Sequence, residues 1–336
     1  MAEPITTGQK NRENEIIEFL RQAIPSHGDK SFQGSLPIGI GDDAAVLRHH
    51  VRAEWAVSCD SSLEGVHFLS NYPPESIGYK SLARATSDLA AMGARPRYFL
   101  LALALPVNRT GKWLRRFAVG MSRACREFGM RLIGGDTSRS SSVTICITVI
   151  GEIASGDAIS RSTAKPGDLV YVTGVLGAAQ VGLEVMLRGM ARRRDLRGLI
   201  RPHLYPRIPI KLAQSLARWR IPTAMMDISD GLSTDLARLC AASRVGSRIY
   251  VDRIPIVTVP PALLARGIDP LSLSLNGGED YGLLFTARPQ SAQRLRHLAR
   301  RIRITQIGEI TRDKTLKLIR ADGTQSVLEP KGWQPF

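Results

Sequence analysis

The stretch SIGYKSLARATSDLAAMGARPRYFLLALAL, residues 76–105, holds the pattern that decides the fold class. Its first part, Ser76 to Met92, places alanine and leucine at helical spacing and stops before Gly93, a residue type that commonly ends helices. Its second part, residues 98–105, is an uninterrupted apolar run with the length of a buried strand. A helix followed directly by a buried strand predicts an α/β architecture.

The flanking sequence repeats this alternation in both directions. N-terminal to a break in the apolar periodicity at 154–162, we expect strands at 36–43, 55–60, 130–136 and 142–153 and helices at 12–23 and 112–128. After the break, we expect strands at 168–173, 222–227, 247–252, 282–286 and 304–310 and helices at 178–190, 209–219 and 231–243. The sequence therefore predicts two α/β domains, over residues 1–154 and 155–336.

The composition is that of an ordinary globular protein with one unusual feature, its charge. Apolar residues make up 43% and charged residues 23% of the 336 residues, which excludes disordered and fibrous proteins. The net charge is +16, and 37 of the 46 basic residues are arginine. Such an excess predicts an anionic partner: nucleic acid, a membrane surface or a phosphorylated small molecule.

Hydropathy and the positions of the cysteines indicate in which cellular compartment we expect the protein. The longest nearly uncharged apolar run, Tyr98 to Val107, is half of the ~20 residues that a membrane-spanning helix needs, so we expect no membrane insertion. The first residues lack the pattern of a signal or transit peptide, so we expect a cytoplasmic protein. The four cysteines are scattered, which argues against a disulfide framework and against a cysteine-ligated zinc site.

The segment GIGDDA, residues 39–44, has the spacing of a dinucleotide-binding fingerprint but the wrong charge for it. Adjacent carboxylates would repel a pyrophosphate, whereas a bound Mg²⁺ would reverse that repulsion. No P-loop motif occurs in the chain. A solvated turn is the alternative interpretation of this segment.

Four further segments place aspartate beside a hydroxyl or glycine: SCD at 58–60, SD at 87–88, GGDT at 134–137 and DISDG at 227–231. For each segment a structural role is an open alternative. Asp230 could cap the helix that follows it, and Asp88 could be an exposed helix position. Five such segments in a chain of net charge +16 nevertheless favour a shared centre for several cations.

Three other features give weaker signals. His67 belongs to no metal-binding pair, so we expect packing or substrate binding rather than zinc. The segment GGEDY, residues 277–281, is either an acidic hairpin turn or part of a site, and GVLG, residues 174–177, is either a phosphate-facing loop or a tight strand-to-helix turn. No nucleophile with a histidine base is evident, and no covalent catalyst is expected.

Together these segments resemble the thiamine-monophosphate kinase family, whose superfamily includes aminoimidazole ribonucleotide synthetase and selenophosphate synthetase. Eight motifs carry the resemblance, in order: GIGDDAAVL, SCDSSLEGVHF, GYKSLARATSDLAAMGARPRYFLLALALP, IGGDTSR, RSTAKPGDLVYVTGVLG, MDISDGLSTDLARLC, LNGGEDYGLLF and KGW. The resemblance covers almost the whole chain. It implies transfer of the γ-phosphoryl group of ATP to thiamine monophosphate by direct in-line attack, with several Mg²⁺ ions.

Site residues follow from the resemblance alone. The implied Mg²⁺ ligands are Asp43, Ser58, Cys59, Asp60, Asp88, Asp136, Asp227 and Asp230. The implied nucleotide contacts are Gly135, Asp136, Arg161 and Ser229, and the implied thiamine-phosphate contacts are His67, Glu279 and Trp333. Support for the in-line transfer is expected from Asp43, Asp60, Asp88, Asp136 and Asp227.

The resemblance also implies an architecture, with three departures from the usual motifs. It implies an N-terminal sheet that joins a second copy in a homodimer barrel, and a C-terminal domain with a mixed sheet and flanking helices. Cys59, Gly282 and Pro335 stand where the family usually has a threonine, an acid and a histidine. Cys59 retains a metal-binding role only if this position binds through its main-chain carbonyl.

Two alternatives remain open at this point. Arginine clusters at 192–201 and 294–303 could form a nucleic-acid surface, but aromatic residues are only 6% and none lie among these arginines, so the stacking expected of a single-strand binder is missing. A different phosphate acceptor within the same superfamily is the second alternative. We expect neither nucleic acid nor membrane as a partner.

Overall fold

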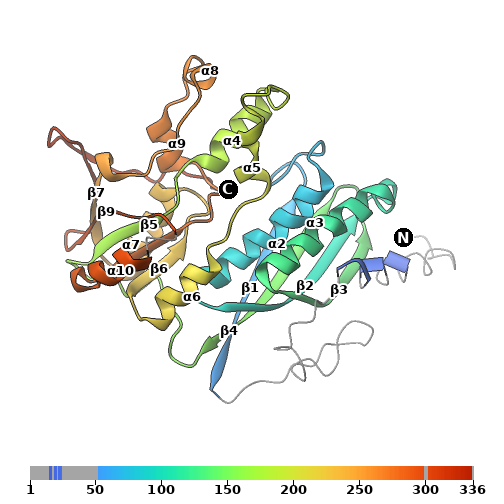
Figure 1. The fold of residues 1–336 in the computed structure, drawn as a ribbon, viewed down its shortest axis with the longest axis horizontal. Helices are drawn as coiled ribbons and strands as arrows, with labels where there is room; N and C mark the ends of the chain where they lie inside the picture. Colours follow the sequence, from blue (N-terminus) through green and yellow to red (C-terminus); the bar gives the residue numbers. More distant parts are fainter. Residues whose placement is uncertain (1–14, 17–18, 21, 25–51, 299–301, 335–336) are drawn as a thin grey trace, which may run out of the picture. The chain divides into compact units, whose positions relative to one another are not determined.

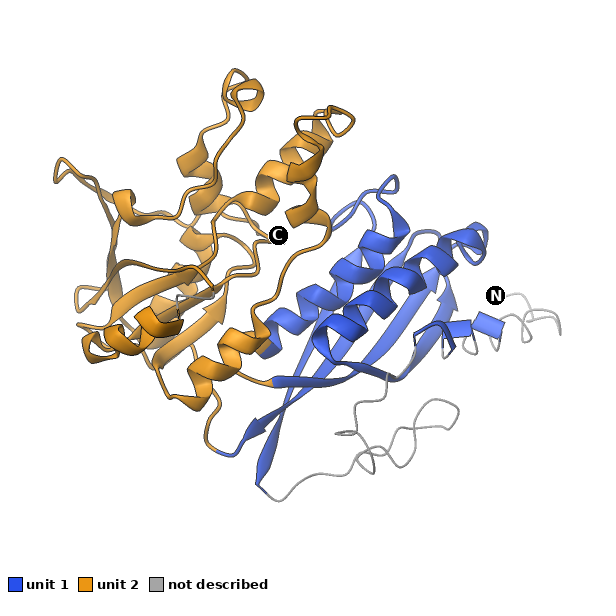
Figure 2. Cartoon of the chain, in the orientation of Figure 1, with its two compact units in different colours: residues 1–89, 95–155 blue, residues 90–94, 156–336 orange. Residues whose placement is uncertain are grey.

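The computed structural model describes residues 15–16, 19–20, 22–24, 52–298 and 302–334. The chain divides into two compact units, unit 1 with residues 1–89 and 95–155 and unit 2 with residues 90–94 and 156–336 (Figure 2). The expected strand at 36–43 lies outside the described residues. Of the expected helix at 12–23, residues 15, 16, 19, 20, 22 and 23 are described as helical.

Unit 1 is built on a sheet of four strands with two helices across one face (Figure 1). The strand order is β1 (Ala53–Leu63), β4 (Thr144–Ala154), β2 (Arg95–Leu105) and β3 (Arg131–Arg139). The helices are α2 (Pro74–Ala91) and α3 (Lys112–Phe128), with a short 3₁₀ turn at Val107–Arg109. Neighbouring strands are antiparallel except for the parallel pair of β2 and β3. These elements confirm the helices and strands predicted for residues 55–153.

Two glycines allow α2 and α3 to pack closely. A Cβ atom at Gly78 would lie 2.2 Å from the carbonyl oxygen of Phe117, and one at Gly120 would lie 1.8 Å from the carbonyl oxygen of Glu75. Real Cβ atoms do not approach backbone oxygens so closely, so any side chain at either position would force the helices apart. The two helices thus form one closely packed layer over one face of the sheet.

The two faces of this sheet differ in burial. Along β4, Ile145, Ile147 and Val149 are fully buried beneath the helices, while the alternate side chains are only partly buried. On the same open face, Val57 of β1 is 63% exposed. The described strands of unit 1 form an open sheet rather than a closed barrel.

Unit 2 is built on a mixed sheet of seven strands. Their order is β11 (Gln325–Val327), β10 (Leu316–Ile319), β7 (Gly246–Tyr250), β9 (Ile304–Thr311), β5 (Leu169–Thr173), β8 (Leu283–Ala287) and β6 (Pro222–Asp227). The pair of β7 and β10 is parallel, and the other neighbours are antiparallel. The mixed sheet agrees with the expectation for the second domain.

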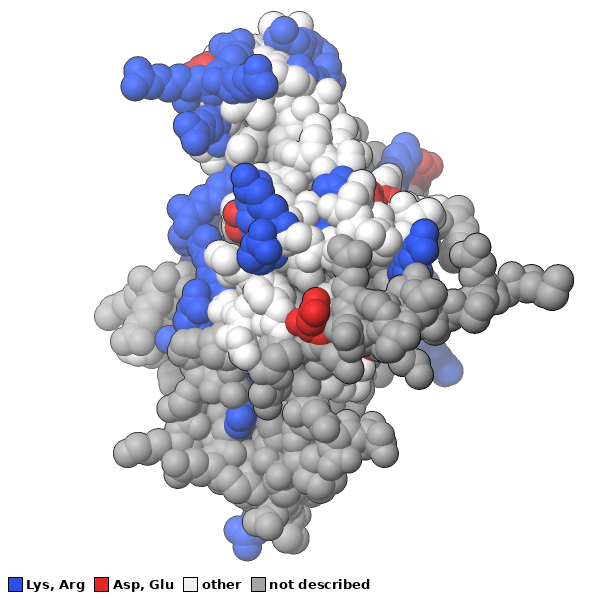
Figure 3. Space-filling view, turned by 90° about the vertical axis from the view of Figure 1, so that its right-hand side faces the viewer, with Lys and Arg blue, Asp and Glu red and all other residues white. Residues whose placement is uncertain are grey.

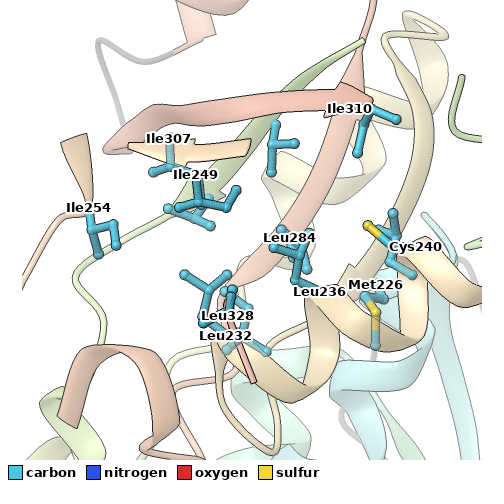
Figure 4. Close-up of a cluster of buried hydrophobic side chains, with 14 of the residues drawn as sticks. Met226, Leu232, Leu236, Cys240, Ile249, Ile254, Leu284, Ile307, Ile310 and Leu328 are labelled. Atoms are coloured by element: carbon cyan, nitrogen blue, oxygen red, sulfur yellow. The ribbon is translucent and has the colours of Figure 1, made fainter. Parts of the chain in front are cut away.

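Helices cover both faces of this sheet. They are α4 (Ala178–Leu187), α5 (Arg201–Leu204), α6 (Ile210–Arg218), α7 (Leu232–Ser243), α8 (Pro261–Leu264), α9 (Pro270–Asn276) and α10 (Ala292–Leu298), with 3₁₀ turns at Arg197–Ile200, Val251–Arg253 and Pro289–Ser291. Val170 and Val172 of β5 pack toward α7, whereas Tyr171 packs toward α6 and α10. Figure 4 shows Leu232, Leu236 and Cys240 of α7 in the first of these two cores.

Several short elements of unit 2 are not among the predicted ones, namely α5, α8, α9, α10, β10 and β11. Each of these has at most seven residues, and the four helices among them span at most two turns, too few for a helical period to stand out. Their burial comes from tertiary packing, as in the cluster that Val181 and Val185 of α4 form with Leu263 of α8. Among the described helices, none combines the length and apolarity needed to cross a bilayer.

Candidate functional site

In unit 1, polar side chains meet between β1 and α2. Ser58 and Asp60 alternate along β1, so both lie on the face that the helices cover. The Ser58 hydroxyl donates a hydrogen bond of 2.5 Å to Oδ2 of Asp88, and Nη2 of Arg84 lies 3.8 Å from Oδ1 of Asp60. Asp88 is thus a partly buried, partnered residue of α2 rather than an exposed helix position. Carboxylate and hydroxyl oxygens are the donors that Mg²⁺ prefers.

Cys59 lies between these residues in sequence but faces the other way. Its Sγ is 3.4 Å from Sγ of Cys146 on the open face of the sheet, and Thr148 donates its hydroxyl to the same sulfur at 3.5 Å. The Cys59 side chain is therefore separated from Ser58 and Asp60 by the sheet itself. A cation on the covered face could reach the main chain of Cys59 but not its side chain.

The GGD segment lies on β3, next to β2. A Cβ atom at Gly135 would lie 1.9 Å from the carbonyl oxygen of Leu101, so the close approach of the strands requires glycine there. Asp136 is exposed and stands in register with Ala102, on the open face of the sheet. Within one chain, Asp136 therefore lies on the opposite face from Ser58, Asp60 and Asp88.

A small pocket lies beside this cluster in unit 1. Its lining residues are Ser62, His67, Phe68, Tyr72, Ser76, Ile77, Lys80, Ser81 and Arg84. Nδ1 of His67 accepts a hydrogen bond of 3.1 Å from the main-chain N–H of Leu63. Because Nδ1 accepts this bond, the imidazole carries its proton on Nε2 when it is neutral. The pocket thus holds the histidine in one orientation next to two cationic side chains.

In unit 2, one buried carboxylate shapes the loop after β6. Oδ2 of Asp235 accepts hydrogen bonds from the main-chain N–H groups of Ser229, Asp230 and Gly231 at 3.0, 3.0 and 3.1 Å. Burial raises the pKa of Asp235 to about 6, although these amides and the nearby Arg238 lower it. Asp230 itself pairs with Arg238. The residue that caps α7 is Gly231, so the helix-cap interpretation of Asp230 was wrong.

Three motifs that are distant in sequence meet at this loop. The carbonyl oxygen of Ser229 accepts a hydrogen bond of 2.7 Å from the main-chain N–H of Glu279, and that of Asp230 accepts one of 3.0 Å from the main-chain N–H of Trp333. A Cβ atom at Gly332 would lie 2.0 Å from the carbonyl oxygen of Asp230. The DISDG, GGEDY and KGW segments therefore form one tightly packed assembly.

The GGEDY segment is a strained loop between α9 and β8, not a hairpin turn. Glu279 and Tyr281 have φ angles of 67° and 50°, in the left-handed region that non-glycine residues rarely adopt. Oε2 of Glu279 lies 3.1 Å from Nδ1 of His203, a residue of α5 that is 2% exposed. Strain of this kind persists only where surrounding contacts impose it, and it is common at functional sites.

Asp280 decides between the two interpretations of the GVLG segment. Its carboxylate accepts hydrogen bonds from the main-chain N–H groups of Gly177 at 2.5 Å and Ala179 at 3.0 Å. Burial raises the pKa of Asp280 to about 6, and these amide bonds lower it by less. Residues 174–177 thus form a tight strand-to-helix turn with an internal anion. A Cβ atom at Gly282 would lie 2.7 Å from the carbonyl oxygen of Thr173, so the acid that the family usually has there would require the main chain to shift.

Three predicted residues remain, of which the structure describes two. Asp227 is buried at the end of β6, Arg161 is exposed and its carbonyl oxygen accepts a hydrogen bond from Ser243, and Asp43 lies outside the described residues. Within residues 52–298 and 302–334, no group of three or more histidine, cysteine, aspartate or glutamate side chains is close enough to hold one metal ion. The multi-cation centre thus stays a prediction.

Four residues of these networks are absent from the sequence-based predictions: His203, Asp235, Arg238 and Asp280. Asp235 and Asp280 lie within the motifs that carry the resemblance, so their positions were available, but their hydrogen bonds depend on the tertiary fold. His203 lies in no motif, and nothing in the sequence around it indicates its burial beside Glu279. Lysine and arginine cover more of the face in Figure 3 than aspartate and glutamate, which agrees with the basic composition.

Comparison with known proteins adds the decisive observation. Residues 41–153 match the family model "AIR synthase related protein, N-terminal domain", and residues 165–320 match the corresponding C-terminal domain. The chain is 37% identical over 317 residues to a thiamine-monophosphate kinase of Escherichia coli, which covers 91% of this chain and 94% of the relative. The chain belongs to the thiamine-monophosphate kinase family.

Other thiamine-monophosphate kinases agree with this assignment. The protein of Bacillus subtilis is 35% identical over 311 residues, with 90% of this chain and 94% of the relative covered. The crystal structure of the protein of Stenotrophomonas maltophilia is similar with a TM-score of 0.81 and 32% identity, over 93% of this chain and 96% of the other. A structure of AaThiL complexed with AMPPCP and TMP has a TM-score of 0.77 and 29% identity, over 100% of both chains.

Proposed function

We propose that the protein transfers the γ-phosphoryl group of ATP to thiamine monophosphate and forms thiamine diphosphate. The observation that carries this proposal is the similarity, over the full length of both chains, to AaThiL complexed with AMPPCP, an analogue of ATP, and TMP. The phosphotransferase belongs to the class in which a phosphate group is the acceptor. Because a phosphate oxygen is already ionised at pH 7, the attack needs no general base.

The proposed Mg²⁺ ligands are Asp43, Ser58, Asp60, Asp88, Asp136, Asp227 and Asp230, together with the main-chain carbonyl of Cys59. The oxygen-only donors Ser58, Asp60 and Asp88, two of which are in direct contact on the covered face, fit this ion. Bound Mg²⁺ would neutralise charge on the transferring phosphoryl group and make an acidic site receptive to phosphate. The residues themselves keep their oxygens fixed, since β1 and α2 set their spacing.

Residues for the two substrates follow the same proposal. Gly135, Asp136, Arg161 and Ser229 bind the nucleotide. His67, Glu279 and Trp333 bind thiamine monophosphate, and the fixed orientation of the His67 ring supports a hydrogen bond to this substrate. The role of the protein in the transfer is to hold the two phosphates in line.

We also propose how the chain is organised around this reaction. Residues 1–154 form the ATP- and Mg²⁺-binding domain, and residues 155–336 form the domain that completes the set of substrate contacts. The open face of the unit 1 sheet, with Val57 exposed, is the surface on which a second copy completes a dimer barrel. The cytoplasm, where ATP is available, is the proposed location.

A coupled assay tests the reaction. With Mg²⁺, ATP and thiamine monophosphate, we expect release of ADP together with thiamine diphosphate, identified by ³¹P NMR. Thiamine without its phosphate serves as the acceptor control and should give no product. Equal ADP release with and without thiamine monophosphate, or no turnover at all, contradicts the proposal.

A further inference from the structure

Unit 2 contains a pocket at the opposite end of strand β6 from the loop at 227–231. The pocket has a volume of about 620 Å³, which is within the usual range for small-molecule sites. It lies where β6 begins and β8 ends, because Pro222 stands in register with Ala287. Asp227 ends β6 after five further residues, or roughly 16 Å of strand. The pocket is therefore separate from the 227–231 loop.

Four cations line this pocket, and no carboxylate does. They are Lys165, Arg220, Arg288 and Arg294. Arg220 forms an ion pair with Asp157 at 2.8 Å, and the other three form no ion pair with any residue that the structure describes. Three unneutralised cations around one hollow create a site of positive potential, which favours a bound anion.

A polar network joins three residues of the pocket lining, Thr163, Lys165 and Thr223. The Thr223 hydroxyl donates to Oδ2 of Asp168 at 2.7 Å, and the main-chain N–H of Lys165 donates to the same oxygen at 2.8 Å. Thr163 donates its hydroxyl to the carbonyl oxygen of Thr223 at 2.5 Å. Asp168 is 4% exposed, so its carboxylate is enclosed together with these hydrogen bonds. The network orders the segment that carries Lys165.

The end of α6 sets the position of one lining residue, Arg220. Arg220 has a φ angle of 50°, although it is neither glycine nor asparagine. The turn holds it there, because its N–H bonds to the carbonyl oxygen of Ala217 at 2.8 Å and its guanidinium bonds to Asp157. The helix end thus places Arg220 in the pocket lining.

We propose that this pocket binds a compact anion that carries two or more adjacent phosphate groups. Guanidinium groups bind phosphate oxygens in bidentate geometry, and the side-chain amide of Gln290 and the hydroxyl of Ser291 offer further donors. The lining contains no aromatic residue, so a nucleobase would find no stacking partner. The phosphates carry the recognition, whether they belong to inorganic pyrophosphate or to a nucleotide.

Isothermal titration of the full-length protein with inorganic pyrophosphate, in EDTA and low salt, tests this proposal. EDTA removes Mg²⁺. Without Mg²⁺ the acidic segments repel phosphate, whereas the basic pocket still attracts it. We expect binding that weakens about tenfold or more in the double variant Arg288→Gln/Arg294→Gln, because two charge-assisted contacts are lost. The matched variant Arg192→Gln/Arg194→Gln, with the same change of charge at exposed positions, should bind as the wild type does.

Hydrogen exchange and a second ligand complete the test. Pyrophosphate should protect amides at 163–165 and 290–294 rather than at 227–231. A parallel titration with ADP separates the sources: ADP binding that is stronger than that of pyrophosphate and is weakened in Arg288→Gln/Arg294→Gln assigns the site to a nucleotide, and any other ADP result assigns it to a free polyphosphate. Absence of pyrophosphate binding, or equal binding by the double variant, overturns the proposal. So does an RNA oligonucleotide that binds through these arginines when pyrophosphate does not bind.

Discussion

Two acidic regions of the molecule are held in place by different means. In unit 1, Ser58 and Asp60 lie on a strand and Asp88 on a helix, so regular hydrogen bonding sets their positions. In unit 2, the loops at 227–231 and 277–281 depend on two buried carboxylates, Asp235 and Asp280, and on left-handed residues. A strand and a helix fix the main chain beneath their side chains through their own regular hydrogen bonds, whereas these loops need buried carboxylates to hold their main chain.

The largest effect is expected in the region held by regular structure. Asp88→Asn should lower kcat roughly 10²–10³-fold, the range seen when one preorganised electrostatic group is lost. The fold should be retained, because the asparagine oxygen can still accept the hydrogen bond from Ser58. Steady-state kinetics and thermal unfolding measure the two effects. Glu75→Gln on the same helix is the control, and near-normal turnover of Asp88→Asn would refute the Mg²⁺ assignment.

A change at Asp235 tests the loop at 227–231, which this buried carboxylate holds in place. Asp235→Ala leaves three amides without their acceptor, and a loop displaced by even 1 Å can cost about 10²-fold in rate. Both kcat and the melting temperature should fall, whereas Asp88→Asn should lower kcat alone. Asp235→Asn, which keeps one oxygen, should lie between Ala and the wild type. An unchanged kcat in Asp235→Ala, or loss in the exposed control Asp252→Ala, contradicts this role.

The pocket beside the unit 1 cluster gives a smaller effect. His67→Ala should raise the apparent KM for thiamine monophosphate about tenfold, which corresponds to one hydrogen bond of roughly 1.4 kcal/mol. The KM for ATP and kcat should change little. His297→Ala, an exposed histidine of α10, is the control. A change confined to the KM for ATP would move His67 to the nucleotide side.

The smallest expected effect concerns pH. The pKa of Asp280 is raised to about 6 in the folded protein, from an ordinary value near 3.8. Its contribution to stability is therefore full below about pH 4 and is lost as the pH rises through 6. Asparagine does not titrate, so the melting temperature of Asp280→Asn relative to the wild type should improve from pH 5 to pH 7.5. A constant difference between the two proteins would show that Asp280 has an ordinary pKa.

The contrast between regular elements and loops also explains which parts of the fold and of the site could be predicted from the sequence. The strands at 53–63 and 222–227 and the helix at 112–128 were predicted to within a few residues, because their apolar patterns are clear. Ser58 and Asp88 were grouped through the family resemblance, and the contact between them follows from the packing of helix α2 on strand β1. The contact between Glu279 and His203, and the internal anion at 174–177, could not be predicted, because both join residues more than 70 positions apart.

That internal anion matters for the design of inhibitors. The turn at 174–177 has the glycines of a phosphate-binding loop, yet the amides of Gly177 and Ala179 already bind the Asp280 carboxylate. Because that carboxylate is tethered, its effective concentration is far above that of any added compound. A phosphate mimic directed at this turn would compete against the protein itself.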